Sequence, residues 1–222
     1  MSGRGKRIPA VAGASAVAVE TAPAGVRLGP LAGLLLGLIR IAIGYLWFTQ
    51  TRWKMPPDFG CGTDPQTGLQ AWMGKKLVDL PPEQLERELA GQGLCDWVGK
   101  EIAHPRFAFY QRFLIDTIHP HLDRLGWFIY LGELTTAVLL ILGLLTRLGG
   151  LIGFLQGVNL TIGLWAVPNE WYWTYILLAL INLTLALTAA GRSLGVDALL
   201  HPRAEAAAAR GNGLARLVAA LT

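Results

Sequence analysis

The sequence predicts an all-α integral membrane protein, in which a bundle of four transmembrane helices carries a helical insertion between the first and second helices. The first observation is composition, because apolar residues make up 53% of the 222 residues and charged residues only 15%, against roughly 25% in a soluble domain. The second is that the apolar residues gather in four windows, each close to the about 20 residues that cross a bilayer. The third is a long stretch between the first two windows that is too polar to stay in lipid. A small soluble protein has too much surface to hide this apolar excess.

The four windows contain only two charged residues, Arg40 in the first and Glu133 in the second. None of the windows alternates apolar and polar residues as a membrane β-strand does. Because backbone in lipid must satisfy its own hydrogen bonds, we expect each window to be a helix. The windows cover approximately residues 28–50, 126–146, 149–167 and 171–191.

The chain divides into two tails, a membrane domain and an insertion within that domain. We expect a flexible N-terminal tail over residues 1–27, a membrane domain over residues 28–200 and a C-terminal tail over residues 201–222. A cleaved signal peptide is the alternative interpretation of the N-terminal tail. The insertion covers residues 51–125 and is expected to contain amphipathic helices that end at Pro120.

Lys and Arg residues in the short flanks predict the orientation of the helices. The N-terminal tail contains four basic residues, as does the C-terminal flank from Arg192 onward. The turn after the second window contains Arg147, whereas the turn after the third contains no basic residue. Since basic flanks stay on the cytoplasmic side, we expect a multi-pass protein of the inner (plasma) membrane with both termini in the cytoplasm and the insertion outside.

The basic residues form no stripe, so the net charge of +4 does not indicate nucleic acid as a partner. The lipid bilayer is the first partner that the sequence predicts. Other subunits of a membrane complex are expected as well, and a homo-oligomer is left open.

The two charges inside the windows are expected to meet. Arg40 lies about ten residues from the outer end of its helix and Glu133 about seven, which gives a depth offset of roughly 5 Å. A charge in hydrocarbon costs on the order of 2.5–3.5 kcal/mol, so a buried Arg40–Glu133 ion pair is the natural arrangement. Both a structural ion pair and a ligand or proton site are open interpretations.

Three amide side chains also fall inside the windows, namely Gln156 and Asn159 in the third and Asn182 in the fourth. They could form hydrogen bonds between helices, as polar residues in membrane bundles do. They could instead bind the carbonyl group of a quinone head, and both interpretations stay open.

Aromatic residues crowd the outer ends of the four windows. All eight Trp residues fall in the outer half of the expected arrangement, where aromatic rings favour the headgroup region. An ordinary interfacial belt and an aromatic-lined entrance for a flat amphiphile are both open. The residues expected at such an entrance are Trp47, Trp53, Lys54, Trp171 and Trp173.

Cys61 and Cys95 both lie in the insertion, on the expected oxidising side of the membrane. A disulfide between them is the leading prediction, with two free thiols or a redox-active pair as alternatives. The sequence contains no CxxCH haem motif, iron–sulfur spacing, GxGxxG or P-loop, so we expect no covalently bound cofactor. His119 and His121 flank a proline without further ligands at suitable spacing, and we assign no metal site.

Several of these residues resemble the patterns of the DoxX/DoxD family of small four-helix membrane proteins. Arg40, Gly44 and Lys54 resemble its R-x3-G … K pattern in the first helix. The stretch GELTTAVLLILGLLTR, which begins at Gly132, resembles its GE…L..GL.TR signature. The stretch GRSLGVD, which ends at Asp197, resembles its closing G-x-x-x-G-x-D motif.

The family includes the small subunit of thiosulfate:quinone oxidoreductase and subunits associated with terminal quinol oxidases. The resemblance therefore implies a membrane subunit of a quinone-linked redox complex, which passes electrons from a sulfur donor such as thiosulfate to the quinone pool. Arg40 and Glu133 would then form the catalytic centre, with Gln156 and Asn159 among the residues that bind the cofactor.

A non-catalytic accessory subunit of a larger respiratory or photosynthetic membrane complex is the main alternative. A small transporter or lipid-binding protein is a third interpretation. Whether the chain itself catalyses a reaction is left open.

Overall fold

The computed structural model describes residues 29–61 and 93–222, and this part of the chain consists of helices joined by turns, with no strand. The predicted all-α fold is confirmed for these residues. The predicted N-terminal tail and the middle of the insertion lie outside the described residues.

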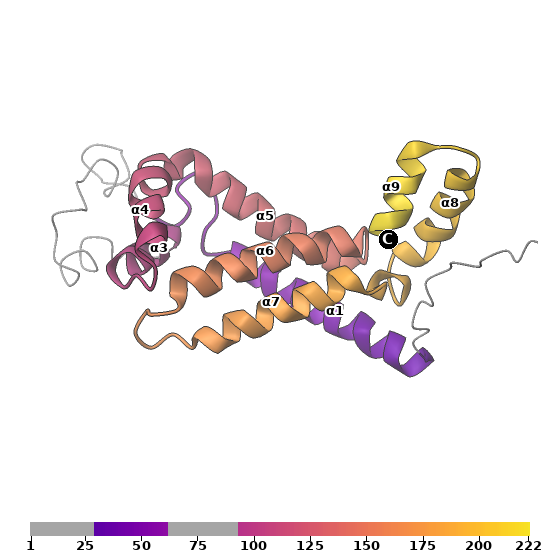
Figure 1. The fold of residues 1–222 in the computed structure, drawn as a ribbon, viewed down its shortest axis with the longest axis horizontal. Coiled ribbons are helices and arrows are strands. Elements are labelled where there is room, and N and C mark those ends of the chain that lie inside the picture. Colours follow the sequence, from indigo (N-terminus) through magenta and orange to yellow (C-terminus); the bar gives the residue numbers. More distant parts are fainter. Residues whose placement is uncertain (1–28, 62–92) are drawn as a thin grey trace, which may run out of the picture.

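Four long helices form the middle of the molecule, and they are α1 (Pro30–Thr51), α5 (Leu122–Leu142), α6 (Thr146–Leu164) and α7 (Tyr172–Leu187) (Figure 1). α1 packs against α5, α5 against α6, and α6 against α7. A Cβ atom at Gly44 of α1 would lie only 2.8 Å from the backbone nitrogen of Ile141 in α5. This close approach sets the register in which the two helices cross.

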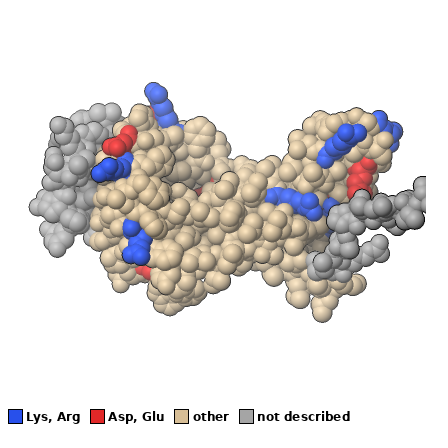
Figure 2. Space-filling view, viewed as in Figure 1, with Lys and Arg blue, Asp and Glu red and all other residues tan. Residues whose placement is uncertain are grey.

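The distribution of charged and apolar side chains on the surface changes along the length of the molecule. By length and composition, two described helical runs are apolar enough to cross a membrane, α1 and the continuous run Ala108–Leu142, while α7 is apolar but shorter. Figure 2 shows Lys, Arg, Asp and Glu side chains gathered toward the two ends of this face and almost none over the middle. An apolar middle between charged ends is what a bilayer requires of a protein that crosses it.

Short helices form one end of the molecule (Figure 1). They are α3 (Leu94–Ala103), α4 (Ala108–Phe113), a π-helical turn (Leu114–Ile118) and a 3-10 turn (His119–His121). The prediction that Pro120 ends the insertion helix is wrong, because the helical run passes through these two turns into α5. Pro120 lies at the start of the 3-10 turn, where its missing N–H removes no hydrogen bond within the turn.

The helices α8 (Asp197–Ala209) and α9 (Gly213–Leu221) form a hairpin at the opposite end (Figure 1). α1 also begins toward this end, so the start of the described chain and the C-terminus both lie away from α3 and α4. The structure thus separates the described parts of the insertion from the chain ends. Which compartment each end faces stays a prediction.

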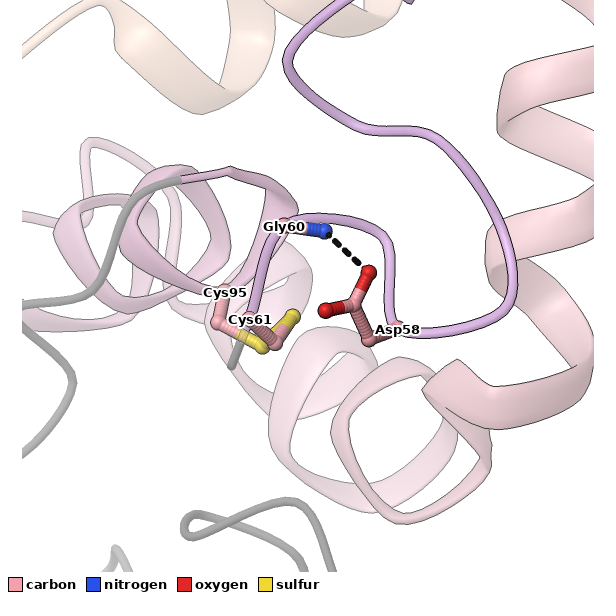
Figure 3. The surroundings of a disulfide bond; sticks show 4 residues. All are labelled: Asp58, Gly60, Cys61 and Cys95. Carbon is pink, nitrogen blue, oxygen red and sulfur yellow. Dashed lines mark hydrogen bonds between the residues drawn. A yellow bond between two sulfur atoms is a disulfide. The ribbon is translucent and has the colours of Figure 1, made fainter. Parts of the chain in front are cut away.

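The disulfide between Cys61 and Cys95 is present, with its two Cα atoms 5.3 Å apart (Figure 3). It ties the segment that follows α1 to the first turn of α3. The same segment is held by a hydrogen bond that Leu94 donates to the carbonyl of Phe59, and the Phe59 side chain is fully buried. The leading prediction for the two cysteines is therefore confirmed, and neither is a free thiol.

Candidate functional site

A cavity of about 800 Å³ lies between the end of α1, the short helices α3 and α4, and the long helices α5, α6 and α7. This volume falls in the range of small-molecule binding sites. Its walls are mainly leucine, isoleucine and aromatic side chains. Its polar lining residues include Lys54, Glu101, Tyr110, Glu133, Gln156 and Asn159.

A buried ion pair forms the first polar group of the cavity. Lys54, three residues after α1, places its Nζ 2.5 Å from Oε1 of Glu133 on α5, and both side chains are about 95% shielded from solvent. Burial lowers the pKa of the Lys54 ammonium, and the Glu133 carboxylate raises it. Among the described residues, Oε2 of Glu133 has no hydrogen-bond partner. The pair therefore offers one unused acceptor oxygen at the wall of the cavity.

The predicted Arg40–Glu133 ion pair is wrong. The Arg40 guanidinium donates to the backbone carbonyls of Leu140 and Ile141, near the end of α5, and to the carbonyl of Leu194 at 2.8 Å. The close contact of Gly44 with α5 sets this register, which leaves Arg40 roughly 10 Å further along α5 than Glu133.

Arg40 belongs instead to a structural junction. The Asp197 carboxylate lies close enough to interact with it electrostatically. The two oxygens of Asp197 accept hydrogen bonds from the backbone nitrogens of Leu145 and Thr146, at 2.8 and 2.9 Å, where α6 begins. Arg40 and Asp197, which both belong to the family-like motifs, thus meet in a structural contact that joins α1, α5, α6 and α8, whereas Lys54 and Glu133 of the same motifs line the cavity.

A second polar group lies on the other side of the cavity. The Tyr110 hydroxyl is 3.2 Å from Oε2 of Glu101 on α3 and 3.1 Å from Oδ1 of Asn159 on α6. Burial raises the pKa of Glu101 to about 8, and the hydrogen bond from Tyr110 lowers it in part. Neither Glu101 nor Tyr110 was predicted from the sequence as a site residue.

The structure brings most of the predicted site residues to the cavity. The predicted residues that line it are Trp47, Trp53, Lys54, Glu133, Gln156 and Asn159. Arg40 does not line it, nor do Trp171 and Trp173, whose exposed rings lie 5.4 Å apart at the start of α7.

The amide residues form hydrogen bonds between elements of the fold. Gln156 of α6 donates to Oγ1 of Thr136 on α5 at 3.0 Å, and Asn182 of α7 accepts at 3.3 Å from the indole nitrogen of Trp47 on α1. These contacts support the interpretation of the amides as interhelical hydrogen-bonding groups. Gln156 and Asn159 also line the cavity.

The cavity has the features that a quinone head group requires. Its walls supply apolar and aromatic surface for the ring of the head group. The Lys54 ammonium and the unpaired Oε2 of Glu133 supply polar groups at the wall. The ammonium donates hydrogen bonds and a carbonyl oxygen accepts them. The residues present therefore fit such a ligand.

A comparison with known protein families matches residues 96–214 to the family described as the TQO small subunit DoxD. The matched region contains Glu101, Tyr110, Glu133 and the α6 amides of the cavity, but not Arg40 or Lys54. No curated protein and no solved structure is significantly similar to the chain. Since the match covers more than half of the residues, the chain belongs to the DoxD family.

Proposed function

We propose that the chain is the quinone-binding membrane subunit of a thiosulfate:quinone oxidoreductase-like complex, with the head group held in the cavity. The observation that carries the proposal is the buried Lys54–Glu133 pair, which faces a mainly apolar cavity and leaves Oε2 of Glu133 unpaired. A bound quinone supplies two-electron, two-proton redox chemistry. The polar residues orient the head group, and the apolar walls exclude water from it.

Each polar group has a distinct part in this proposal. Nζ of Lys54 donates to a carbonyl oxygen of the head group, since an ammonium has three donors and Glu133 uses one of them. Glu133 holds the ammonium in place. The indoles of Trp47 and Trp53 supply flat apolar faces at the end of α1.

We place oxidation of the sulfur donor on a partner subunit, because both cysteines of the chain are in the disulfide. Electrons from a donor such as thiosulfate then reach the cavity from outside this chain. Other membrane subunits are therefore required partners in this proposal.

All four long helices cross the inner (plasma) membrane in this proposal, with the insertion outside and both tails in the cytoplasm. The support is the charge-poor middle of the molecule, the placement of α8, α9 and the start of α1 opposite the short helices, and the basic residues that the sequence contains in both tails. The cavity then lies near the extracytoplasmic face.

Binding of a short-chain quinone analogue to the purified protein tests the proposal, with quenching of tryptophan fluorescence as the signal. We expect Lys54→Gln to raise the dissociation constant about tenfold, since a hydrogen bond from a charged donor contributes about 1.5–3 kcal/mol. Lys100→Gln is the matched control, because Lys100 forms a partly exposed pair with Asp96 and does not line the cavity.

A second variant removes both charges at once, Lys54→Gln with Glu133→Gln, so that no unpaired buried charge disturbs the fold. It is expected to bind as weakly as the single variant. Wild-type affinity in both variants, or no binding to the wild-type protein, would contradict the proposal.

A non-catalytic accessory subunit is the second candidate. The exposed aromatic side chains near the cavity end, Phe109, Phe128 and Trp171, favour it because they offer a docking surface for larger subunits. Deletion of the chain distinguishes the two functions. Loss of complex assembly with normal quinone reduction by the remaining subunits supports the accessory role.

A further inference from the structure

The Tyr110 hydroxyl lies between two groups that would both accept a hydrogen bond. Oε2 of Glu101 is 3.2 Å away and Oδ1 of Asn159 is 3.1 Å away, yet a phenol has one proton to donate. If Glu101 is ionised, one of the two acceptors goes without a donor. If Glu101 is a neutral acid, its Oε2 donates to Oη of Tyr110, which in turn donates to Oδ1 of Asn159, and no acceptor of this chain lacks a donor.

The setting of Glu101 favours the neutral acid. Its carboxyl group is buried, and Tyr110 is its only hydrogen-bond partner among the described residues. A Cβ atom at Gly163 of α6 would lie 2.6 Å from either carboxyl oxygen, so the group rests directly on that helix. An ionised carboxylate without a counter-ion is costly in such a place, and burial raises the pKa of Glu101 to about 8.

Among the described residues, the groups that surround Glu101 do not supply a nearby positive charge. Tyr110 reaches it from α4, and Tyr175 of α7 interacts with it electrostatically while donating its own hydroxyl to Glu170. On its own helix, Lys100 is held by Asp96 at 2.7 Å. The Lys54 ammonium also lines the cavity, but it is already paired with Glu133.

We propose that Glu101 is a proton-holding group of the cavity, which exchanges its proton through Tyr110 with an oxygen atom of the bound head group. This inference rests on the proposed function and deepens it, because it assigns a proton path to the same cavity. Both residues line the cavity, and Asn159 holds the Tyr110 hydroxyl at its wall.

The path supplies one of the two protons that two-electron reduction of the head group takes up, and the second comes from water. Tyr110 gives its hydroxyl proton to the ligand oxygen, and Oε2 of Glu101 passes its proton to Oη of Tyr110. Tyr110 ends unchanged and Glu101 ends as a carboxylate, which regains a proton from water after the ligand leaves. The electrons come from the sulfur donor of the proposed function and do not pass through these residues.

Infrared difference spectroscopy on the purified full chain tests the first step, because a protonated carboxylic acid has its own carbonyl band. We expect a band at neutral pH that disappears as the pH rises through about 8. The band should be absent in Glu101→Gln and unchanged in Asp123→Asn, which alters an exposed carboxylate at the start of α5. Absence of the band in the wild-type protein, or its persistence in Glu101→Gln, would overturn the inference.

Addition of the quinone analogue tests the second step. Binding should shift the Glu101 band in the wild-type protein and leave it unshifted in Tyr110→Phe, which keeps the ring and removes the hydroxyl. The fluorescence assay measures how much analogue this variant binds, so that its spectrum is compared with that of the wild type at equal occupancy.

The outcomes separate the inference from the proposed function. Lys54-dependent binding without any band shift, or an equal shift in Tyr110→Phe, overturns the proton path and leaves the quinone site intact. A wild-type protein that shows the band but binds no analogue overturns both.

Discussion

Burial affects the charged residues of this chain in different ways, as Lys54, Glu133, Glu101 and Arg40 show. Lys54 and Glu133 pair at the cavity, whereas Arg40 is satisfied by backbone carbonyls and a nearby carboxylate. Glu101 has no cationic partner in the described part of the chain, and protonation removes the cost of burying its charge. Arg40 thus has a structural role. The charged residues proposed to act in the site lie nearer the C-terminal end of α1.

Replacement of Arg40 should affect stability far more than ligand binding. Arg40→Leu leaves several buried carbonyl oxygens without a donor, and we expect a loss of about 3 kcal/mol in the free energy of unfolding. Denaturant unfolding in detergent measures it. The affinity for the quinone analogue should stay within a factor of about two of the wild type among folded molecules. A loss of affinity as large as that of Lys54→Gln would show that Arg40 contributes to ligand binding.

Glu101 should make the stability of the protein depend on pH. The folded state keeps a proton on Glu101 up to about pH 8, whereas the unfolded chain loses it near 4.5. The contribution of Glu101 to the free energy of unfolding is therefore full below about 4.5, declines as the pH rises toward about 8, and is level above. Unfolding curves across this range measure the decline.

The matched variant for this measurement is Glu101→Gln, whose side chain stays neutral at every pH. The difference between its stability and that of the wild type should carry the whole pH dependence assigned to Glu101. A constant difference between the two proteins would show that Glu101 is not protonated in the folded state.

At the scale of the elements, helix positions were predictable but helix register was not. The composition of the windows predicts α1, α5, α6 and α7 to within a few residues at most ends. The register of α1 against α5 depends on the contact of Gly44 with Ile141. Counting residues from the outer end of each helix gives the depth of a side chain but does not include this contact. The Arg40–Glu133 prediction failed for that reason.

The short helices of the insertion carry two site residues, Glu101 and Tyr110, that were not predicted from the sequence. Leu94, Val98 and Glu101 share one face of α3 at helical spacing, and all three are buried. An acidic residue on an otherwise apolar face is a signal that could have identified Glu101. Tyr110 gave no such signal, because its partner Asn159 is 49 residues away and reaches it only in the folded chain.

The disulfide should stabilise the cavity end of the molecule. It closes a sequence separation of 34 residues, for which the chain-entropy estimate gives roughly 3–4 kcal/mol. The double replacement Cys61→Ser with Cys95→Ser should lower the free energy of unfolding by about this amount. It should also weaken quinone-analogue binding, because the segment that carries Lys54 loses its tie to α3.

Reduction of the wild-type protein is the matched control, and it should reproduce the effect of the double variant. An unchanged unfolding curve after reduction would show that apolar packing around Phe59 alone holds this segment.

At the scale of the whole molecule, composition predicts the class of protein, while the site depends on long-range contacts. The apolar excess and the four windows are enough to indicate a membrane protein built of helices. Trp47, Trp53 and Lys54 are adjacent in sequence, so their common location was predictable. The pairing of Lys54 with Glu133 was not, since it depends on how the segment after α1 folds back onto α5.

The two ends of the molecule should face opposite sides of the membrane. Cys61 and Cys95 are joined in the disulfide, so a cysteine introduced elsewhere is the reactive thiol of each variant. We expect Arg106→Cys, between α3 and α4, to react with a membrane-impermeant maleimide on intact cells. Arg203→Cys, on the exposed face of α8, should react only after the membrane is permeabilised. The basic residues near the chain ends give the physical reason, because they hold that end on the cytoplasmic side. Labelling in the reverse order would place the cavity on the cytoplasmic side. Labelling of both positions on intact cells would show that the described helices do not separate the two ends across the bilayer.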